Sequence, residues 1–177
     1  MDKNKKTLRW ITRTAIFVAL LVVVQAATAG LGNQFVTGSA VNLILIVSVM
    51  TCGLSSGATV AIVSPLFAKL FGIGPLWQII PMIMLGNFVL VLLWRLLGNR
   101  GDRKMWYPVA LIAAAGIKFL VLWLGVAKWI VPIVLGLPAP KAAVVSAAFS
   151  WPQLVTALIG GVLAILVLPL VKKAIKE

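Results

Sequence analysis

The sequence contains no histidine, one cysteine and only three acidic residues. The acids are Asp2, Asp102 and Glu177, which lie at the two ends of the chain and inside a basic stretch. A hydrolase needs a general base or a set of metal ligands, and these residue types supply neither. Cys52 by itself forms neither a disulfide framework nor a metal cluster. We therefore expect no catalysis, no bound metal and no cofactor.

Charge is scarce as well: 11% of the residues are charged and 62% are hydrophobic, with a mean hydropathy of +1.13. A soluble domain of 177 residues cannot bury that much apolar surface, so the solvent of this chain is lipid. The net charge of +13 would suggest nucleic-acid binding in a soluble protein. Twelve of the sixteen Lys and Arg residues, however, lie in three clusters, at the N-terminus, at 95–104 and at 172–176. Such clusters are typical of cytoplasmic membrane loops, so we expect the lipid bilayer as a partner and no nucleic acid.

Six apolar segments predict an all-α integral membrane protein whose single transmembrane domain covers residues 1–177. The predicted spans are roughly 10–30, 38–54, 58–71, 76–97, 106–135 and 146–171. Six crossings that begin inside place both termini and all three basic clusters in the cytoplasm. The tryptophans agree with this topology because they fall at span ends, as in the aromatic belts of membrane proteins. Those at inner ends are Trp10, Trp94 and Trp106, and those at outer ends are Trp77, Trp129 and Trp151.

The first span carries a stripe of small side chains. From Thr14 to Gly30 it has no charge and is long enough to cross a hydrocarbon core of about 30 Å. Five more apolar spans follow it, which argues against the alternative of a signal peptide cleaved after Ala29. Small residues let helices approach closely in lipid, so we expect the stripe to dock onto another helix, with room for an external partner. Its members, at steps of four and three, are Ala15, Ala19, Val22, Ala26 and Ala29.

Two polar side chains lie deep in predicted spans. Lys118 is near the middle of the fifth span, where a charge costs at least about 2.5–3.5 kcal/mol. Because no acid is available to pair with it, we favour a ligand-binding cation over a lysine whose ammonium reaches the interface along its stem. Asn87 lies at a similar depth in the fourth span. A buried amide must be hydrogen-bonded, either to another helix or to a ligand.

Further candidate ligand contacts lie near the predicted outer surface. Small ligands bind in concave sites with aromatic walls and a few placed polar groups. The alternatives are that the tryptophans belong to the belt or to helix packing, and that the loop residues are a hydrated connection. The candidates are Asn33 and Gln34 in the first outer loop, Gln153 at the start of the sixth span, and Trp77, Trp129 and Trp151.

The chain resembles the substrate-binding S-components of energy-coupling factor (ECF) vitamin transporters. The features that carry the resemblance are the length, six spans with both ends inside, and the Ala15-x-x-x-Ala19 step on a first helix flanked by basic residues. The Arg13-x-Ala15-x-x-x-Ala19-Leu20 pattern is similar to that family as well. Small-xxx-small steps occur in many membrane helices, so the likeness rests mainly on architecture.

This resemblance implies a high-affinity binding subunit for a vitamin or related small nutrient, in a bacterial or archaeal plasma membrane. Ala15 and Ala19 would dock onto a membrane-embedded T-component that two ATPase subunits drive. The first outer loop would act as a lid. The sequence has no GxxxxGK[ST] phosphate-binding loop, so ATP would be hydrolysed by the partners.

Two other classes remain open, a self-contained secondary transporter or channel and a non-transporting scaffold with six spans. A proton-coupled transporter usually keeps an acid at membrane depth, although carbonyls and hydroxyls can also hold sodium. The absence of such an acid argues against the first class, and the buried Lys118 argues against the second. The same two features favour an anionic or neutral substrate over a cationic one.

Overall fold

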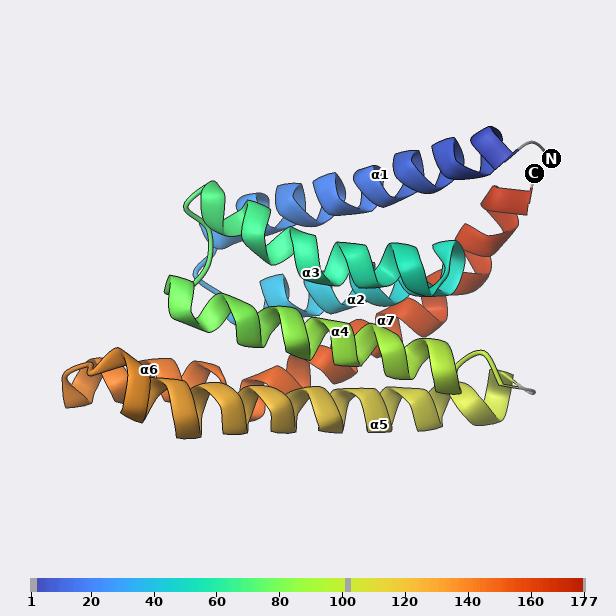
Figure 1. The fold of residues 1–177 in the computed structure, drawn as a ribbon. Coiled ribbons are helices and arrows are strands. Elements are labelled where there is room, and N and C mark those ends of the chain that lie inside the picture. Colours follow the sequence, from blue (N-terminus) through green and yellow to red (C-terminus); the bar gives the residue numbers. More distant parts are fainter. Residues whose placement is uncertain (1–2, 101–102, 177) are drawn as a thin grey trace.

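The structure is a computed structural model that describes residues 3–100 and 103–176. Every regular element in these ranges is helical, and Figure 1 shows the helices running side by side in one bundle. The helices are α1 (Lys3–Ala29), α2 (Gln34–Cys52), α3 (Leu54–Leu70), α4 (Ile80–Leu97), α5 (Arg103–Leu122), α6 (Ala139–Ala148) and α7 (Trp151–Lys176). A short 3₁₀ turn, η1 (Trp77–Ile79), precedes α4, and α5 continues as the wider π-type turns of η2 (Trp123–Leu135).

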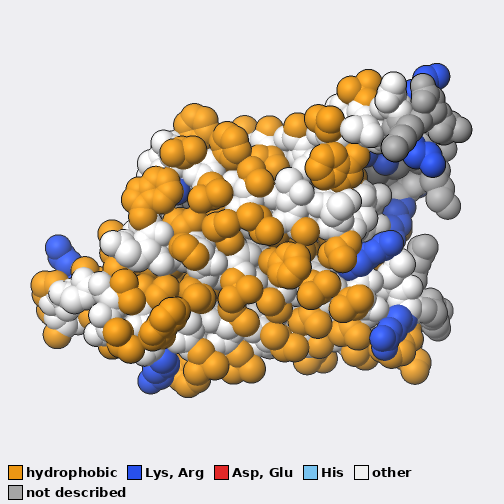
Figure 2. Space-filling model, in the orientation of Figure 1, with side chains coloured by type: hydrophobic (Ala, Val, Ile, Leu, Met, Phe, Trp, Pro, Cys, Tyr) orange, Lys and Arg blue, Asp and Glu red, His pale blue; other side chains and the backbone are white. Residues whose placement is uncertain are grey.

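The helices are apolar enough for a membrane protein. Five segments have the length and composition of a membrane span, namely Asn4–Ala29, Gln34–Cys52, Trp77–Leu97, Met105–Leu135 and Ala139–Ala174. The sixth apolar helix, Leu54–Leu70, is shorter, at 17 residues. In Figure 2, hydrophobic side chains cover the middle of the visible face, and Lys and Arg gather mainly at the end where Figure 1 places both termini. The prediction of an all-α membrane bundle is confirmed.

Two connections differ from what the sequence suggested. The spans expected at 38–54 and 58–71 leave a connection at 55–57, but in the structure Gly53 alone joins α2 to α3, and its φ of 89° is open to glycine. The spans expected at 106–135 and 146–171 leave a connection at 136–145, but residues from Ala139 onward form the separate helix α6. Pro138 and Pro140 flank the first residue of α6, where a missing amide hydrogen costs no helical hydrogen bond.

Helix α2 is the centre of the bundle and packs against α1, α3, α4 and α7. Its residues 44–50 are all buried. Close approach of α2 and α7 depends on glycine, since a Cβ on Gly160 would lie 2.6 Å from the Asn42 Cβ and 2.6 Å from the Ser39 carbonyl oxygen. On the other side of the contact, a Cβ on Gly38 would lie 2.8 Å from the Thr156 methyl carbon.

Replacing Gly160 by alanine is therefore expected to destabilise the protein by about 1–3 kcal/mol, because the new methyl group meets backbone that must shift. The measurement is thermal unfolding in detergent. Gly116→Ala is the matched control, because a Cβ there meets nothing within 4 Å and alanine favours the helix. Equal unfolding temperatures for the two variants would contradict the proposed tight contact between α2 and α7.

Candidate functional site

A cavity of about 250 Å³ opens between the helices at the end of the bundle opposite the termini. Its wall is built by the last turns of α1 and α3, the first half of α2, the first half of α4, the later part of α5 and the start of α7. Apolar side chains such as Ile80, Ile83, Leu122 and Phe149 form much of this wall. Polar side chains are inserted at a few points, which is the composition of a small-molecule site.

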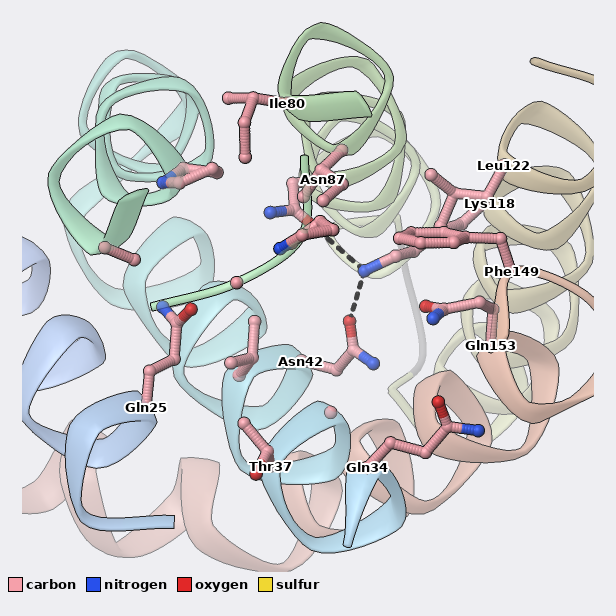
Figure 3. A pocket seen from close by; sticks show the side chains of 17 residues that line it. Gln25, Gln34, Thr37, Asn42, Ile80, Asn87, Lys118, Leu122, Phe149 and Gln153 are labelled. Carbon is pink, nitrogen blue, oxygen red and sulfur yellow. Dashed lines mark hydrogen bonds between the residues drawn. The ribbon is translucent and has the colours of Figure 1, made fainter. Parts of the chain in front are cut away.

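Lys118 lies in this wall and is only 3% exposed. Its Nζ donates to Asn42 Oδ1 at 2.6 Å and to Asn87 Oδ1 at 2.8 Å, as Figure 3 shows. Both asparagines are also buried and also line the cavity. The three side chains come from α5, α2 and α4, so one ammonium group connects three helices.

The position of Asn42 is fixed from its other side by α7. Its Nδ2 donates to Thr156 Oγ1 at 3.4 Å, and Thr156 in turn donates to the Gln153 carbonyl oxygen at 3.1 Å. The amide nitrogen of Asn42 is thus occupied by Thr156, which leaves its oxygen for Lys118. The close contact at Gly38 and Gly160 brings these residues together, so the packing of α2 on α7 determines the geometry around the ammonium.

Lys118 and Asn87 both keep N–H donors that make no hydrogen bond with a described residue. An ammonium has three donors, and Lys118 uses two of them within the described residues. The Asn87 amide nitrogen makes no hydrogen bond with any described residue. The chain's acids, Asp2, Asp102 and Glu177, all lie outside the described ranges, so no described carboxylate compensates the lysine charge. The Lys118 ammonium and the Asn87 amide nitrogen therefore offer a positive charge and free N–H donors at the cavity wall.

The mouth of the cavity carries uncharged polar side chains. Gln25 from α1, Gln34 and Thr37 from α2, and Gln153 from α7 all line it (Figure 3). Gln153 Nε2 donates to the Ala148 carbonyl oxygen at 3.0 Å, and Gln25 Nε2 donates to the Leu21 carbonyl oxygen at 3.4 Å. The carbonyl oxygens of these two side chains therefore remain as acceptors.

The cavity brings together four of the eight ligand-binding candidates, Lys118, Asn87, Gln153 and Gln34. Asn33 does not line it and instead caps α2, its side-chain oxygen accepting from the Phe35 amide at 2.9 Å. Three tryptophans, Trp77, Trp129 and Trp151, are exposed and are also absent from the wall. Trp77 lies 5.9 Å from the Lys69 ammonium, and Trp151 packs on Phe35 with ring centroids 5.7 Å apart.

The ligand-binding candidates named from the sequence do not include four residues that line the cavity, Gln25, Thr37, Asn42 and Phe149. A signal for the α2 residues is nevertheless present. Positions 34, 37, 38, 41 and 42 line the cavity and follow the i, i+3, i+4, i+7, i+8 spacing of one helix face. Gln25 is the only amide side chain in the first apolar span.

A second feature lies on the outside of the bundle. Ala15 and Ala19 on α1 are exposed and line an apolar groove of about 630 Å³ between α1 and α3. Phe67 and Phe71 from the end of α3 complete it. Helix α1 is held on α3 by the Thr14–Ser56 hydrogen bond of 2.8 Å and by Trp10 Nε1 donating to Ser55 Oγ at 3.1 Å. Within the described chain, the face of α1 that carries Ala15 and Ala19, called the alanine face below, stays exposed.

Within the described ranges, no group of three or more His, Cys, Asp or Glu side chains could hold a metal ion. Comparison of the chain with curated proteins and with solved structures gives no match. The family model for the substrate-specific component of ECF transporters matches residues 9–172. Because this match covers nearly the whole length, the chain belongs to the substrate-specific components of ECF transporters, which are membrane-embedded substrate-binding subunits and not enzymes.

Proposed function

We propose that the protein captures a small anionic or neutral nutrient, such as a vitamin, and delivers it to an ATP-driven importer in a bacterial or archaeal plasma membrane. The nutrient binds in the cavity lined by Lys118, Asn87, Gln34 and Gln153. The single observation that carries this proposal is the buried ammonium of Lys118, which faces a cavity without any described acid beside it. A charge is costly in hydrocarbon, so its place at a cavity indicates a ligand.

The proposed orientation places the cavity at the outer surface. The basic clusters lie toward the opposite end of the bundle (Figure 2), and basic segments favour the cytoplasmic side. In this orientation both termini are cytoplasmic, and the turn from Phe71 to Leu76 and the start of α2 border the entrance. Lys69 and Lys141 then lie toward the outer side, where they add positive potential for an approaching anion.

The proposed partners are a T-component and two ATPase subunits. Ala15 and Ala19 are the proposed docking residues because they are exposed, small and set in an apolar groove. Shape complementarity along such residues is the main source of helix association in lipid, where the hydrophobic effect contributes little. This chain supplies no nucleotide-binding loop of its own.

The proposal is tested by native mass spectrometry of the detergent-purified protein as it is produced. We expect a co-purifying small molecule, lost on mild unfolding, because a high-affinity binding subunit retains its substrate through purification. An apo spectrum that persists after addition of a panel of acidic and neutral vitamins would contradict the proposal and favour a scaffold.

Reconstitution separates the proposed function from an independent transporter. In liposomes that contain this chain alone, we expect binding of the labelled nutrient without accumulation. Accumulation is expected only when the T-component, the ATPase subunits and ATP are all present, because the chain has neither a nucleotide-binding loop nor a described acid for proton coupling. Uptake by the chain alone would contradict this and favour a secondary transporter or channel.

A further inference from the structure

From the charge and shape of the cavity, we infer that the substrate is a slender monocarboxylate with an uncharged hydrogen-bonding group, a hydroxyl or an amide, at its far end. The carboxylate binds at Lys118 and Asn87, and the far end lies at the glutamines of the mouth. This inference rests on the proposed function, because it names the chemical class of the nutrient that the cavity binds.

The charge of the cavity wall determines which net charge a bound ligand can carry. Among the described residues that line the cavity, Lys118 is the single one with a charged side chain. A ligand with one negative charge neutralises it, whereas a second negative charge would be buried without a partner. A cation would face the ammonium directly. The cavity therefore selects a monoanion over dianions and cations.

The donors and the charge of the wall together favour a carboxylate over a phosphate. Lys118 has one N–H left after its bonds to Asn42 and Asn87, and the Asn87 amide nitrogen is without a described partner although the residue is 3% exposed. These N–H groups can donate to the two oxygens of a carboxylate, which carries one negative charge. A phosphate monoester carries about 1.5 to 2 negative charges at neutral pH, so part of its charge would be buried without a partner.

The length of the cavity follows from α2. Gln34 at the mouth and Asn42 beside Lys118 are eight residues apart, which is about 12 Å along a helix axis. Apart from Thr37, the wall also carries the apolar side chains Val41, Ile80 and Ile83. A volume of about 250 Å³ lies below the 300–1,000 Å³ of most drug-sized ligand pockets. A narrow ligand with an apolar middle fits these dimensions.

The far end of the ligand meets uncharged amide groups. The side-chain nitrogens of Gln25 and Gln153 each donate one hydrogen bond to a backbone carbonyl, that of Leu21 and that of Ala148. Each of these amides keeps its carbonyl oxygen and one N–H for a ligand. A hydroxyl or an amide of the ligand can both donate to and accept from such groups, whereas a second carboxylate would find no positive charge among the described lining residues at this end.

The test uses the full-length protein in detergent and yeast extract as a general nutrient mixture. The small molecules of the extract are separated by anion exchange at neutral pH into unretained, weakly retained and strongly retained fractions. We expect the weakly retained, singly charged fraction to raise the unfolding temperature. Methyl esterification of that fraction is expected to weaken binding roughly 10- to 100-fold, because it removes the charge that Lys118 binds.

A variant pair links this effect to the lysine. In Lys118→Gln, the acid and its methyl ester are expected to bind with equal, weak affinity, because the charged partner is absent. Lys128→Gln is the matched control, since Lys128 is exposed and lies over the Trp123 ring at 5.2 Å. This control is expected to keep the full preference of the wild-type protein for the acid.

The outcomes separate the two proposals. Stabilisation by the unretained or the strongly retained fraction, or binding that survives esterification, would overturn the monocarboxylate inference and leave nutrient binding intact. A preference for the acid that persists in Lys118→Gln would also overturn it. If no fraction stabilises the protein and no compound co-purifies with it, the proposed function itself fails.

Discussion

Replacing Lys118 by methionine is expected to weaken substrate binding by about 100-fold and to abolish ATP-driven uptake at low substrate concentrations, while the helical bundle still folds. Methionine is unbranched and of similar length, so it fills the same buried volume. The substrate, however, loses the single positive charge in the cavity wall. A charge-assisted hydrogen bond of about 1.5–3 kcal/mol, together with the lost neutralisation of the ligand, gives an effect of this size.

The same variant distinguishes a ligand-binding lysine from a purely structural one. Lys118 joins α2 and α4 through Asn42 and Asn87, so a structural role alone predicts a lower unfolding temperature of the ligand-free protein and unchanged affinity for substrate. A ligand role predicts the loss of ligand-induced stabilisation. Lys128→Met is the control, and isothermal titration of both variants gives the affinities. Affinity within about twofold of wild type in Lys118→Met would contradict the ligand role.

The helical architecture follows from the sequence because hydropathy and length dominate the structure of a chain whose solvent is lipid. Local chemistry at the connections is harder to predict. A turn at Gly53 is indicated by the glycine, but its reduction to one residue depends on the packing of α3 against α2. Helix α6 begins inside the connection expected between residues 135 and 146, because Pro138 and Pro140 are typical of a loop but are also suited to a helix N-terminus.

The deep polar residues could be identified because the bilayer penalises them. Lys118 and Asn87 stand out in apolar spans, and the structure places both at one cavity. Their connection through Asn42 could not be predicted, since it depends on which faces of α2, α4 and α5 meet. The three tryptophan candidates are large enough to form a pocket wall, but all three are exposed. Two residues with smaller side chains, Phe149 and Gln25, line the cavity wall instead.

The cavity and the alanine face use different parts of α1. Gln25, near the end of the helix, lines the cavity, whereas Ala19 and Ala15 lie about 1.7 and 2.8 turns closer to the N-terminus and line the groove between α1 and α3. The same helix thus lines both the cavity and the proposed docking groove. Substitutions at the alanines are therefore expected to separate capture from delivery.

Replacing both Ala15 and Ala19 by phenylalanine is expected to reduce ATP-driven uptake at least about ten-fold without changing substrate affinity. Two rings fill the α1–α3 groove and prevent the close backbone approach on which helix association in lipid depends. Neither residue lines the cavity, so titration of the isolated subunit should give the wild-type affinity. Uptake is measured in liposomes with the T-component and ATPase subunits, and association is measured by co-purification with the T-component.

Ile16→Phe is the matched control, because Ile16 is the next residue along α1, is 58% exposed and does not line the groove. A ring at this position faces lipid, where it is tolerated, so uptake and co-purification are expected to remain at wild-type levels. If the double variant still co-purifies with the T-component and transports normally, the alanine face is not the docking surface. If Ile16→Phe fails equally, the effect reflects a disturbed α1 and gives no support to a specific role of the groove.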